Sequence, residues 1–290
     1  MTDTPTPADP TPGDDAVNNA APGPKRSLKS LVMRGSAWTL AGQFSQMALQ
    51  IGGNVVLARL LFPSAFGLMA LAQVITRGLE MFSDVGIRGS VLYHERGDDP
   101  RFLDTAWTIQ VIRGGILLLC CCALAYPAAV FYQQPILAAM LPVMGVAAML
   151  RGFVSTAQFT LNRHIQLDRI VKWESAIHVF SLVVLIGWAL VHRPVWALVG
   201  GGVITTVARV LTSHMLIPHY RNGFAWDREA ARSMARFGRW ILLSTMLTFF
   251  LTQGDKAILG KVLDSAALLG IYTLAANLAT KVVRLMDGLS

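Results

Sequence analysis

The chain contains little charge and few cysteines. Only 14% of its 290 residues are charged and 53% are hydrophobic, whereas a soluble domain carries about 25% charged residues. This composition excludes a disordered chain, argues against a soluble globular domain and leaves a helical membrane protein with several spans. The net charge of +8 does not indicate nucleic-acid binding, because the basic residues lie in short clusters between long uncharged runs.

The sequence also lacks the motifs of common enzyme and metal sites. It has no Walker A loop, the motif that would indicate ATP hydrolysis. It also has no polar segment with the paired aspartates that bind a sugar nucleotide. Its six histidines are scattered, and its three cysteines, Cys120–Cys122, are adjacent, which suits neither metal ligation nor a disulfide. We therefore predict no enzyme activity, no cofactor and no metal site, and expect the cysteines to be buried small apolar residues.

The first 24 residues are rich in proline, threonine, aspartate and alanine and contain no lysine or arginine. A secretory signal peptide needs a basic start followed by an apolar stretch, and this segment has neither. We expect residues 1–24 to form a disordered tail.

Long uncharged runs indicate transmembrane helices. Residues Gly35–Ala58, for example, contain no charge, and about 20 residues rising 1.5 Å each cross the roughly 30 Å hydrocarbon core. The runs are continuously apolar, without the two-residue alternation of barrel strands. We therefore predict an all-α polytopic membrane protein whose eight transmembrane helices are Ser36–Ala58, Ala65–Asp84, Thr105–Ala125, Ile136–Thr156, Trp173–Val191, Val195–Ile217, Phe237–Gly260 and Ala266–Val283.

The distribution of basic residues predicts the orientation. Most of the 25 lysines and arginines fall before the first span or in segments on the same side of the membrane. Because basic loops stay in the cytoplasm, we expect a multi-pass protein of the bacterial inner membrane with a cytoplasmic N-terminus.

The start of the seventh span resembles the start of the first. Residues 34–38 (RGSAW) align with residues 236–240 (RFGRW), and residues 57–61 (LARLL) align with residues 259–263 (LGKVL). Spans 1–2 and spans 7–8 thus look like the same helical hairpin, and both start on the same side of the membrane, which predicts a parallel repeat. We expect the chain to be truncated within its second repeat. The expected units are a six-helix lobe at 25–217, a cytoplasmic linker at 218–236 and the first two helices of a second lobe at 237–290.

Several segments match motifs of one transporter family. They are 57–71 (LARLLFPSAFGLMAL), 82–87 (FSDVGI), 105–114 (TAWTIQVIRG), 161–163 (LNR), 255–260 (DKAILG) and 269–272 (LGIY). On these residues the chain resembles the polysaccharide transporter branch of the multidrug/oligosaccharidyl-lipid/polysaccharide exporter superfamily. That branch handles capsule, exopolysaccharide or lipopolysaccharide repeat units.

The resemblance implies two six-helix lobes around a central cavity. It also implies alternating access that turns a polyprenyl-diphosphate-linked oligosaccharide from the cytoplasmic to the outer leaflet, with a polysaccharide polymerase and assembly proteins as further partners. One alternative is a multidrug or cation antiporter of the same superfamily, whose cavity would hold aromatic and acidic residues rather than arginines. Another is a truncated membrane scaffold that transports nothing.

Three arginines inside predicted spans are candidates for binding the headgroup of such a cargo. Arg77, Arg113 and Arg209 each lie about 11–12 Å from the cytoplasmic end of a span. Intramembrane charges are costly and mark functional sites, and a guanidinium binds phosphate oxygens through two hydrogen bonds. We predict that the three line one cavity; the alternative is that each side chain extends back to the headgroups.

Acidic residues could couple transport to an ion. Glu80 and Asp84 follow Arg77 at helical spacing, so the three share one face and Arg77 can pair with Glu80. The sharper hypothesis is a proton or cation site, because a poorly hydrated carboxylate gains affinity for protons; the simpler one is a salt bridge, with Asp84 capping the helix end. Asp255 and Lys256 form a second candidate for ion coupling.

The first span carries a row of amides. Gln43, Gln46, Gln50 and Asn54 recur every three or four residues and therefore share a helical face. Amides can bond sugar hydroxyls in a cavity without the cost of a charge. The alternative is hydrogen bonding between helices, which is common in membrane bundles.

Overall fold

The computed structural model describes residues 42, 44–53, 55–57, 59–164, 166–191, 194–217, 222–263 and 265–287. Every regular element in these ranges is a helix, which confirms the predicted all-α class. The described part of the first predicted span is helical as well. The remaining helices are α2 (Pro63–Phe82), α3 (Ile87–Tyr93), α4 (Pro100–Phe131), α5 (Leu137–Gly152), α6 (Ala157–Arg163), α7 (Leu167–Val191), α8 (Pro194–Ser213), α9 (Arg228–Val262) and α10 (Ala266–Asp287). The tail at residues 1–24 lies outside the described residues.

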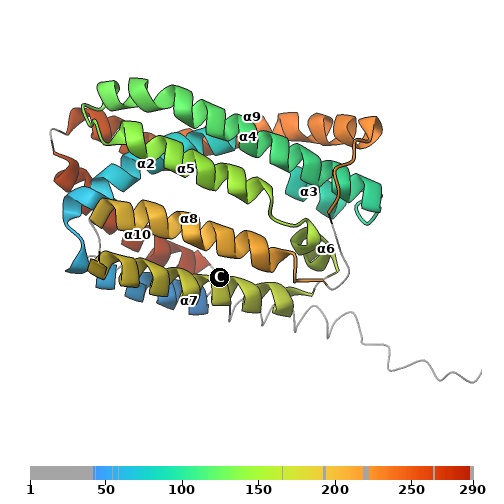
Figure 1. Ribbon diagram of the computed structural model, residues 1–290, viewed down its shortest axis with the longest axis horizontal. Coiled ribbons are helices and arrows are strands. Elements are labelled where there is room, and N and C mark those ends of the chain that lie inside the picture. Colours follow the sequence, from blue (N-terminus) through green and yellow to red (C-terminus); the bar gives the residue numbers. More distant parts are fainter. Residues whose placement is uncertain are drawn as a thin grey trace, which may run out of the picture.

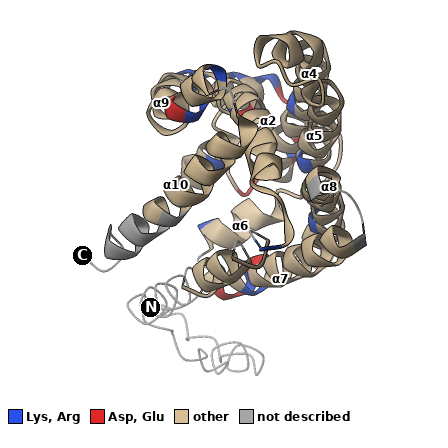
Figure 2. Cartoon of the chain, turned by 90° about the vertical axis from the view of Figure 1, so that its left-hand side faces the viewer, with Lys and Arg blue, Asp and Glu red and all other residues tan. Residues whose placement is uncertain are grey.

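The helices run beside one another along the long axis of the molecule (Figure 1). We call the end that holds α3, α6 and the first turns of α4 and α9 the clasp end. The opposite end holds the α4–α5 and α9–α10 connections, and we call it the turn end. Viewed along the axis, α2 lies between the pair α9 and α10 and the group α4, α5 and α8 (Figure 2). The largest core cluster joins α2, α4, α5, α8 and α10 and includes Leu71, Leu137, Met140, Leu141 and Leu269.

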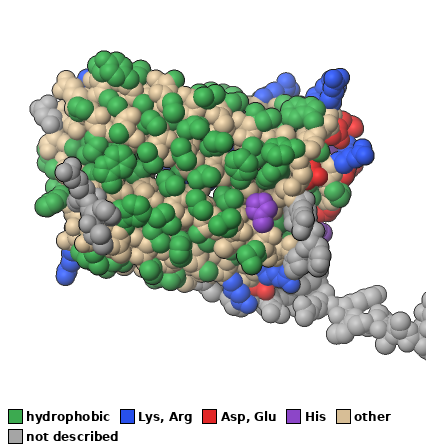
Figure 3. Space-filling view, viewed as in Figure 1, with side chains coloured by type: hydrophobic (Ala, Val, Ile, Leu, Met, Phe, Trp, Pro, Cys, Tyr) green, Lys and Arg blue, Asp and Glu red, His purple; other side chains and the backbone are tan. Residues whose placement is uncertain are grey.

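The surface is that of a membrane protein. Hydrophobic side chains cover the middle of the molecule, and charged side chains gather mostly at the clasp end (Figure 3). Many large apolar residues are exposed, such as Leu119 at 70% and Leu251 at 77%, because the hydrocarbon core replaces water as their solvent. The chain is therefore an all-α polytopic membrane protein.

Among the described residues, fewer helices qualify as spans by length and composition than the eight predicted. By length and composition α2, α4, α7 and α8 can each cross a membrane, and α5 with α6 forms a fifth candidate bent by 56°. In α10 the apolar stretch is shorter, at Ala266–Asn277. The predicted count of eight spans stays a prediction.

Most helix boundaries differ from the predicted ones by a few residues, and two of the differences are instructive. α4 continues through Pro127 to Phe131, beyond the predicted end at Ala125, because a proline is tolerated in a membrane helix when its surroundings satisfy the freed carbonyl. α9 begins at Arg228, inside the segment predicted as a linker and before the predicted start at Phe237. Its N-cap is Asp227, whose carboxylate accepts hydrogen bonds from the amides of the first turn.

The cysteine prediction was right in part. Cys120, Cys121 and Cys122 are unbonded, and Cys121 is buried. Cys122 is exposed, because three consecutive helical residues point in directions about 100° apart and cannot all face the core.

α2 and α10 cross at two glycines that oppose each other. A Cβ on Gly67 would lie 1.8 Å from the carbonyl oxygen of Ala266, and a Cβ on Gly270 would lie 1.9 Å from that of Pro63. The contact is reciprocal, since each glycine meets the carbonyl four residues before the other. Two backbones approach this closely only where neither carries a side chain. Gly67 and Gly270 are also aligned, after a one-residue insertion, in the predicted repeat.

The segment before α9 is bound along the first turns of α4. Three of its backbone amides donate to α4 side chains: Gly223 to Asp104 at 2.9 Å, Ala225 to Thr108 at 3.2 Å and Asp227 to Thr105 at 3.0 Å. The three amides lie outside any helix, so these bonds supply the hydrogen-bond partners that regular secondary structure does not. The start of α9 is therefore held against α4 at the clasp end.

A charge cluster centred on Arg96 reinforces this attachment. Its guanidinium pairs with Asp99 at 2.8 Å, Asp227 at 3.0 Å and Glu229 at 3.2 Å. Asp99 caps α4 and Asp227 caps α9, so one arginine bridges two helix starts. The Arg96 guanidinium lowers the pKa of Asp99, while the backbone amide of Glu229 is the main cause of the lowered pKa of Asp227. We call Arg96, Asp99, Asp227 and Glu229 the clasp.

Candidate functional site

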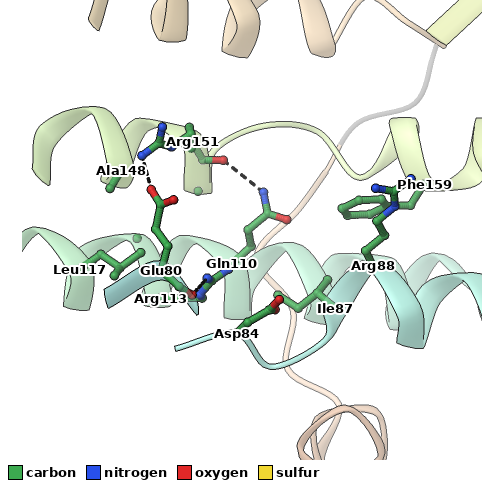
Figure 4. Close-up of a pocket in the computed structure, with 12 residues that line it drawn as sticks. Glu80, Asp84, Ile87, Arg88, Gln110, Arg113, Leu117, Ala148, Arg151 and Phe159 are labelled. Carbon is green, nitrogen blue, oxygen red and sulfur yellow. Dashed lines mark hydrogen bonds and ion pairs between the residues drawn. The ribbon is translucent and has the colours of Figure 1, made fainter. Parts of the chain in front are cut away.

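A charged cavity opens on the clasp side of the bundle, among α2, α3, α4, α5 and α6. Its volume is about 330 Å³. Three arginines and two carboxylates line it among apolar and amide side chains (Figure 4). The lining residues are Glu80, Asp84, Ile87, Arg88, Gln110, Arg113, Gly114, Leu117, Ala148, Arg151, Gly152 and Phe159.

Close packing of α4 on α5 brings two of these arginines to the cavity. A Cβ on Gly114 would lie 2.9 Å from the carbonyl oxygen of Met149, and a Cβ on Gly152 would lie 2.8 Å from that of Gln110. Both glycines therefore permit contact between the two backbones. Each stands next to an arginine in the sequence, so Arg113 and Arg151 come from facing helices.

Glu80 is the centre of the polar network in the cavity. Its carboxylate is paired with the guanidinium of Arg151, and its backbone carbonyl accepts a hydrogen bond from Arg113. The Nε of Arg113 also donates to the hydroxyl of Ser83 at 3.0 Å. Both arginines thus converge on the last turn of α2, which lacks a basic residue of its own there.

The ends of α2 and α5 are shaped by residues of the same cavity. Asp84 accepts a hydrogen bond at 3.0 Å from the amide of Gly86, whose φ of 64° allows the turn into α3. Gln110 donates to the carbonyl oxygens of Arg151 at 3.2 Å and Val154 at 3.3 Å. Those carbonyls lie at and just beyond the end of α5, where the regular helical donors run out.

The cavity is suited to binding an anion. It holds three guanidinium groups against two carboxylates, so one positive charge is in excess. An arginine has five N–H donors, of which Arg113 uses its Nε and one Nη for the neutral oxygens of Ser83 and Glu80. Hydrogen bonds to neutral oxygens leave the charge of Arg113 uncompensated, which is the property that a site for phosphate or carboxylate needs. Among the described residues, no three histidine, cysteine, aspartate or glutamate side chains are placed so that they could hold a metal ion.

The structure does not bring the three predicted arginines into one site. Arg113 lines the cavity, but Arg77 is exposed on α2 and does not contribute to its lining. The guanidinium of Arg209 lies 5.0 Å from the centre of the Trp173 ring, over its face. The spacing of Arg77 and Glu80 would allow them to pair, but in the structure Glu80 pairs with Arg151.

The other candidates have different surroundings. Asp84 lies in the cavity with Glu80, whereas Asp255 accepts a hydrogen bond from the hydroxyl of Tyr272 at 2.7 Å. Lys256 is half-buried on α9. The second acidic candidate is thus separate from the cavity.

The predicted amide row is described only in part. Gln46 donates to the carboxylate of Glu174 on α7 at 3.3 Å, and Gln50 is half-buried. Gln43 and Asn54 lie outside the described residues. For Gln46 the structure thus shows a hydrogen bond between helices, which was the alternative to sugar binding.

Sequence reasoning missed Arg88, Gln110 and Arg151 as cavity residues. Arg88 and Arg151 stand at the edges of apolar runs, where basic residues ordinarily mark topology. The signal that could have found Arg151 is the carboxylate of Glu80 within a span, which requires a cationic partner from a neighbouring helix. Which helix is the neighbour cannot be read from the spacing.

The fold is that of a multi-pass helical membrane protein, and three arginines and two carboxylates line a cavity among its helices. The model of a family described as polysaccharide biosynthesis proteins matches residues 56–289. The chain belongs to this family, which confirms the predicted resemblance.

Two relatives are similar over most of this chain. The succinoglycan biosynthesis transport protein ExoT of Rhizobium meliloti (strain 1021) is 20% identical over 249 residues, which are 86% of this chain and 50% of that protein. An uncharacterized membrane protein in the cps region of Klebsiella pneumoniae is 20% identical over 258 residues, or 87% of this chain and 52% of that protein. The chain therefore spans about half the length of these relatives. No solved structure matches the chain.

Proposed function

We propose that the protein is part of a flippase. It moves a polyprenyl-diphosphate-linked oligosaccharide from the cytoplasmic to the outer leaflet during the biosynthesis of a surface polysaccharide. Membership of a polysaccharide biosynthesis family and similarity to a protein named for succinoglycan transport support this proposal. The expected membrane is the bacterial inner membrane, with the clasp end in the cytoplasm.

The charged cavity is the observation that carries the proposal. A diphosphate headgroup cannot cross hydrocarbon without cationic partners, since the free-energy cost of an unpaired charge there is several kcal/mol. Arg113 offers such a partner, because its hydrogen bonds go to neutral oxygens. The lipid chain of the cargo can stay in the bilayer while the headgroup is bound among the helices.

The Glu80–Arg151 pair suggests how release could be coupled to an ion. While the carboxylate is ionised, it occupies the guanidinium of Arg151. Binding of a proton or a cation to Glu80 removes that competition and leaves Arg151 free to bind phosphate. When the ion leaves, Glu80 pairs with Arg151 again and the affinity for the cargo falls. The same two residues therefore control both binding and release of the cargo.

Polysaccharide export by variant proteins tests the proposal. Arg113→Gln and Arg151→Gln, made in the full-length gene product in its host, should abolish surface polysaccharide while the amount of protein in the membrane is unchanged. Arg77→Gln is the matched control, since it removes an exposed arginine from α2 outside the cavity. Arg113→Lys should restore part of the export because it keeps the charge.

Normal export by both cavity variants would refute the role of the cavity. A change in drug resistance with polysaccharide unaffected would instead favour the antiporter of the same superfamily. Loss of export in Arg77→Gln alone would indicate that the headgroup binds at the exposed face of α2 and not in the cavity.

A further inference from the structure

A second basic cavity lies at the clasp end, apart from the site between the helices. Its volume is about 350 Å³, and it is formed by the end of α3, the α3–α4 loop and the first turns of α9. The lining residues are His94, Arg96, Glu229, Ala230, Arg232, Ser233 and Arg236. We propose that this cavity binds the phosphate of an anionic membrane lipid.

Two of the three arginines in this cavity are available to bind an anion. Arg96 is committed to the clasp, where it pairs with Glu229 and with two aspartates. Arg232 and Arg236 follow each other by one turn on α9, so both can face the cavity. Among the described residues neither is within ion-pair distance of a carboxylate. Two guanidinium groups one turn apart can bind the oxygens of one phosphate.

Neutral donors complete the site. The amide of Arg96 donates to Nδ1 of His94 at 3.1 Å, so the neutral imidazole carries its proton on Nε2 and can donate there. The ring is held by stacking on Phe102, with centroids 4.8 Å apart. Ser233 on α9 also lines the cavity. The cavity thus has neutral donors from the end of α3 and from α9.

The position of the cavity along α9 favours a lipid over a soluble anion. Trp240 is 67% exposed, and the guanidinium of Arg239 lies 5.7 Å from the centre of its ring. An exposed tryptophan beside a basic residue marks the boundary between hydrocarbon and headgroups. Arg236 is one turn from Trp240 towards the clasp end, or about 6 Å. A headgroup layer is about 5–7 Å thick on each side of the core, so Arg236 lies at the depth of lipid phosphates.

Arg232 can reach the same layer. It lies one further turn from Trp240, about 12 Å in all, and its flexible side chain can extend back towards the headgroups. The proposal depends on the membrane-spanning fold and not on flippase activity, so either can fail without the other.

Lipid binding by the purified full chain in detergent tests the proposal. Phosphatidylglycerol, phosphatidylcholine and inorganic pyrophosphate are titrated separately, and bound adducts are counted by native mass spectrometry. Arg232→Gln/Arg236→Gln should bind phosphatidylglycerol about 100-fold more weakly, because each guanidinium that hydrogen-bonds the charged phosphate contributes about tenfold. The control Arg228→Gln/Arg239→Gln removes the same charge from the same helix and should stay within about twofold of the unaltered protein, since neither residue lines the cavity and neither loses such a bond.

Three results would overturn the proposal. Equal loss in both double variants would mean that only the net charge attracts the lipid. Equal binding of phosphatidylcholine would remove the selectivity for anionic headgroups. Tight binding of pyrophosphate together with weak binding of phosphatidylglycerol would assign the cavity to a soluble ligand.

Discussion

The crossing of α2 and α10 allows a quantitative test by adding single methyl groups. A Cβ at Gly67 would lie 1.8 Å from the carbonyl oxygen of Ala266, and a Cβ at Gly270 would lie 1.9 Å from that of Pro63, whereas real Cβ contacts are essentially never shorter than 3.0 Å. Gly67→Ala or Gly270→Ala must therefore move the two helices apart by more than about 1 Å at this point. Such overpacking reduces the free energy of unfolding by about 1–3 kcal/mol.

The two substitutions should not be additive. Once the first methyl group has separated the helices, the second finds space already open, so the double variant should lose about as much stability as one single variant. Neighbouring residues show such interaction energies, of about 0.5–3 kcal/mol, whereas distant residues do not. The assay is denaturant-induced unfolding in detergent micelles, followed by circular dichroism or tryptophan fluorescence.

The chain offers matched controls for this test. A Cβ on Gly115 in α4 or on Gly254 in α9 would meet no atom within 4 Å. Gly115→Ala and Gly254→Ala should therefore be neutral or stabilising, by up to about 1 kcal/mol, through helix propensity alone. If Gly67→Ala and Gly270→Ala behave like these controls, or if their losses simply add, the reciprocal contact is wrong.

Three further predictions concern the clasp, its attachment and the topology. Arg96 is the main cause of the lowered pKa of Asp99 in the folded chain, so the stability that this carboxylate contributes is present above its unfolded-state pKa of about 4 and is lost as the pH falls below that; Arg96→Gln should flatten the acid limb of a melting-temperature profile in detergent, and identical profiles would contradict this. Asn222→Ala removes hydrogen bonds to two buried hydroxyl residues on the α5–α6 connection and should reduce the free energy of unfolding by about 1–3 kcal/mol, a reasoning that an unchanged denaturation midpoint would refute. In a cysteine-free background, Glu95→Cys should react with an impermeant maleimide only in inverted vesicles and Gln133→Cys only in intact cells lacking an outer-membrane barrier; the reverse pattern would overturn the orientation.

Helices were predictable from this sequence because their signal is local. An uncharged run of about 20 residues has few other folds open to it in a bilayer, and each predicted span overlaps a helix in the described part of the chain. The end of α4 was not predictable in this way, because Pro127 is a helix breaker in water and is tolerated within a membrane bundle. The early start of α9 depends on contacts of its N-terminal segment with α4, which are distant in sequence.

The site was predictable only by residue type. The rule that intramembrane charges are functional candidates identified Arg113, Glu80 and Asp84, which the structure places in one cavity. The rule could not identify Arg151 as the partner of Glu80, because which residues of two different helices pair depends on how the helices pack. Equal depth along separate spans also failed to predict proximity, since Arg209 stacks on Trp173 and its direction around the helix is set by neighbouring helices.

Transbilayer movement of a lipid-linked oligosaccharide by the purified, reconstituted protein tests the central claim most directly. The measurement follows how much of a polyprenyl-diphosphate oligosaccharide with a fluorescent sugar becomes accessible to an impermeant quencher outside proteoliposomes. We predict that the unaltered protein exposes the internal pool and that Arg113→Gln/Arg151→Gln leaves it inaccessible, while Arg77→Gln matches the unaltered protein. Equal movement in vesicles with the double cavity variant, or none with the unaltered protein, would contradict the account.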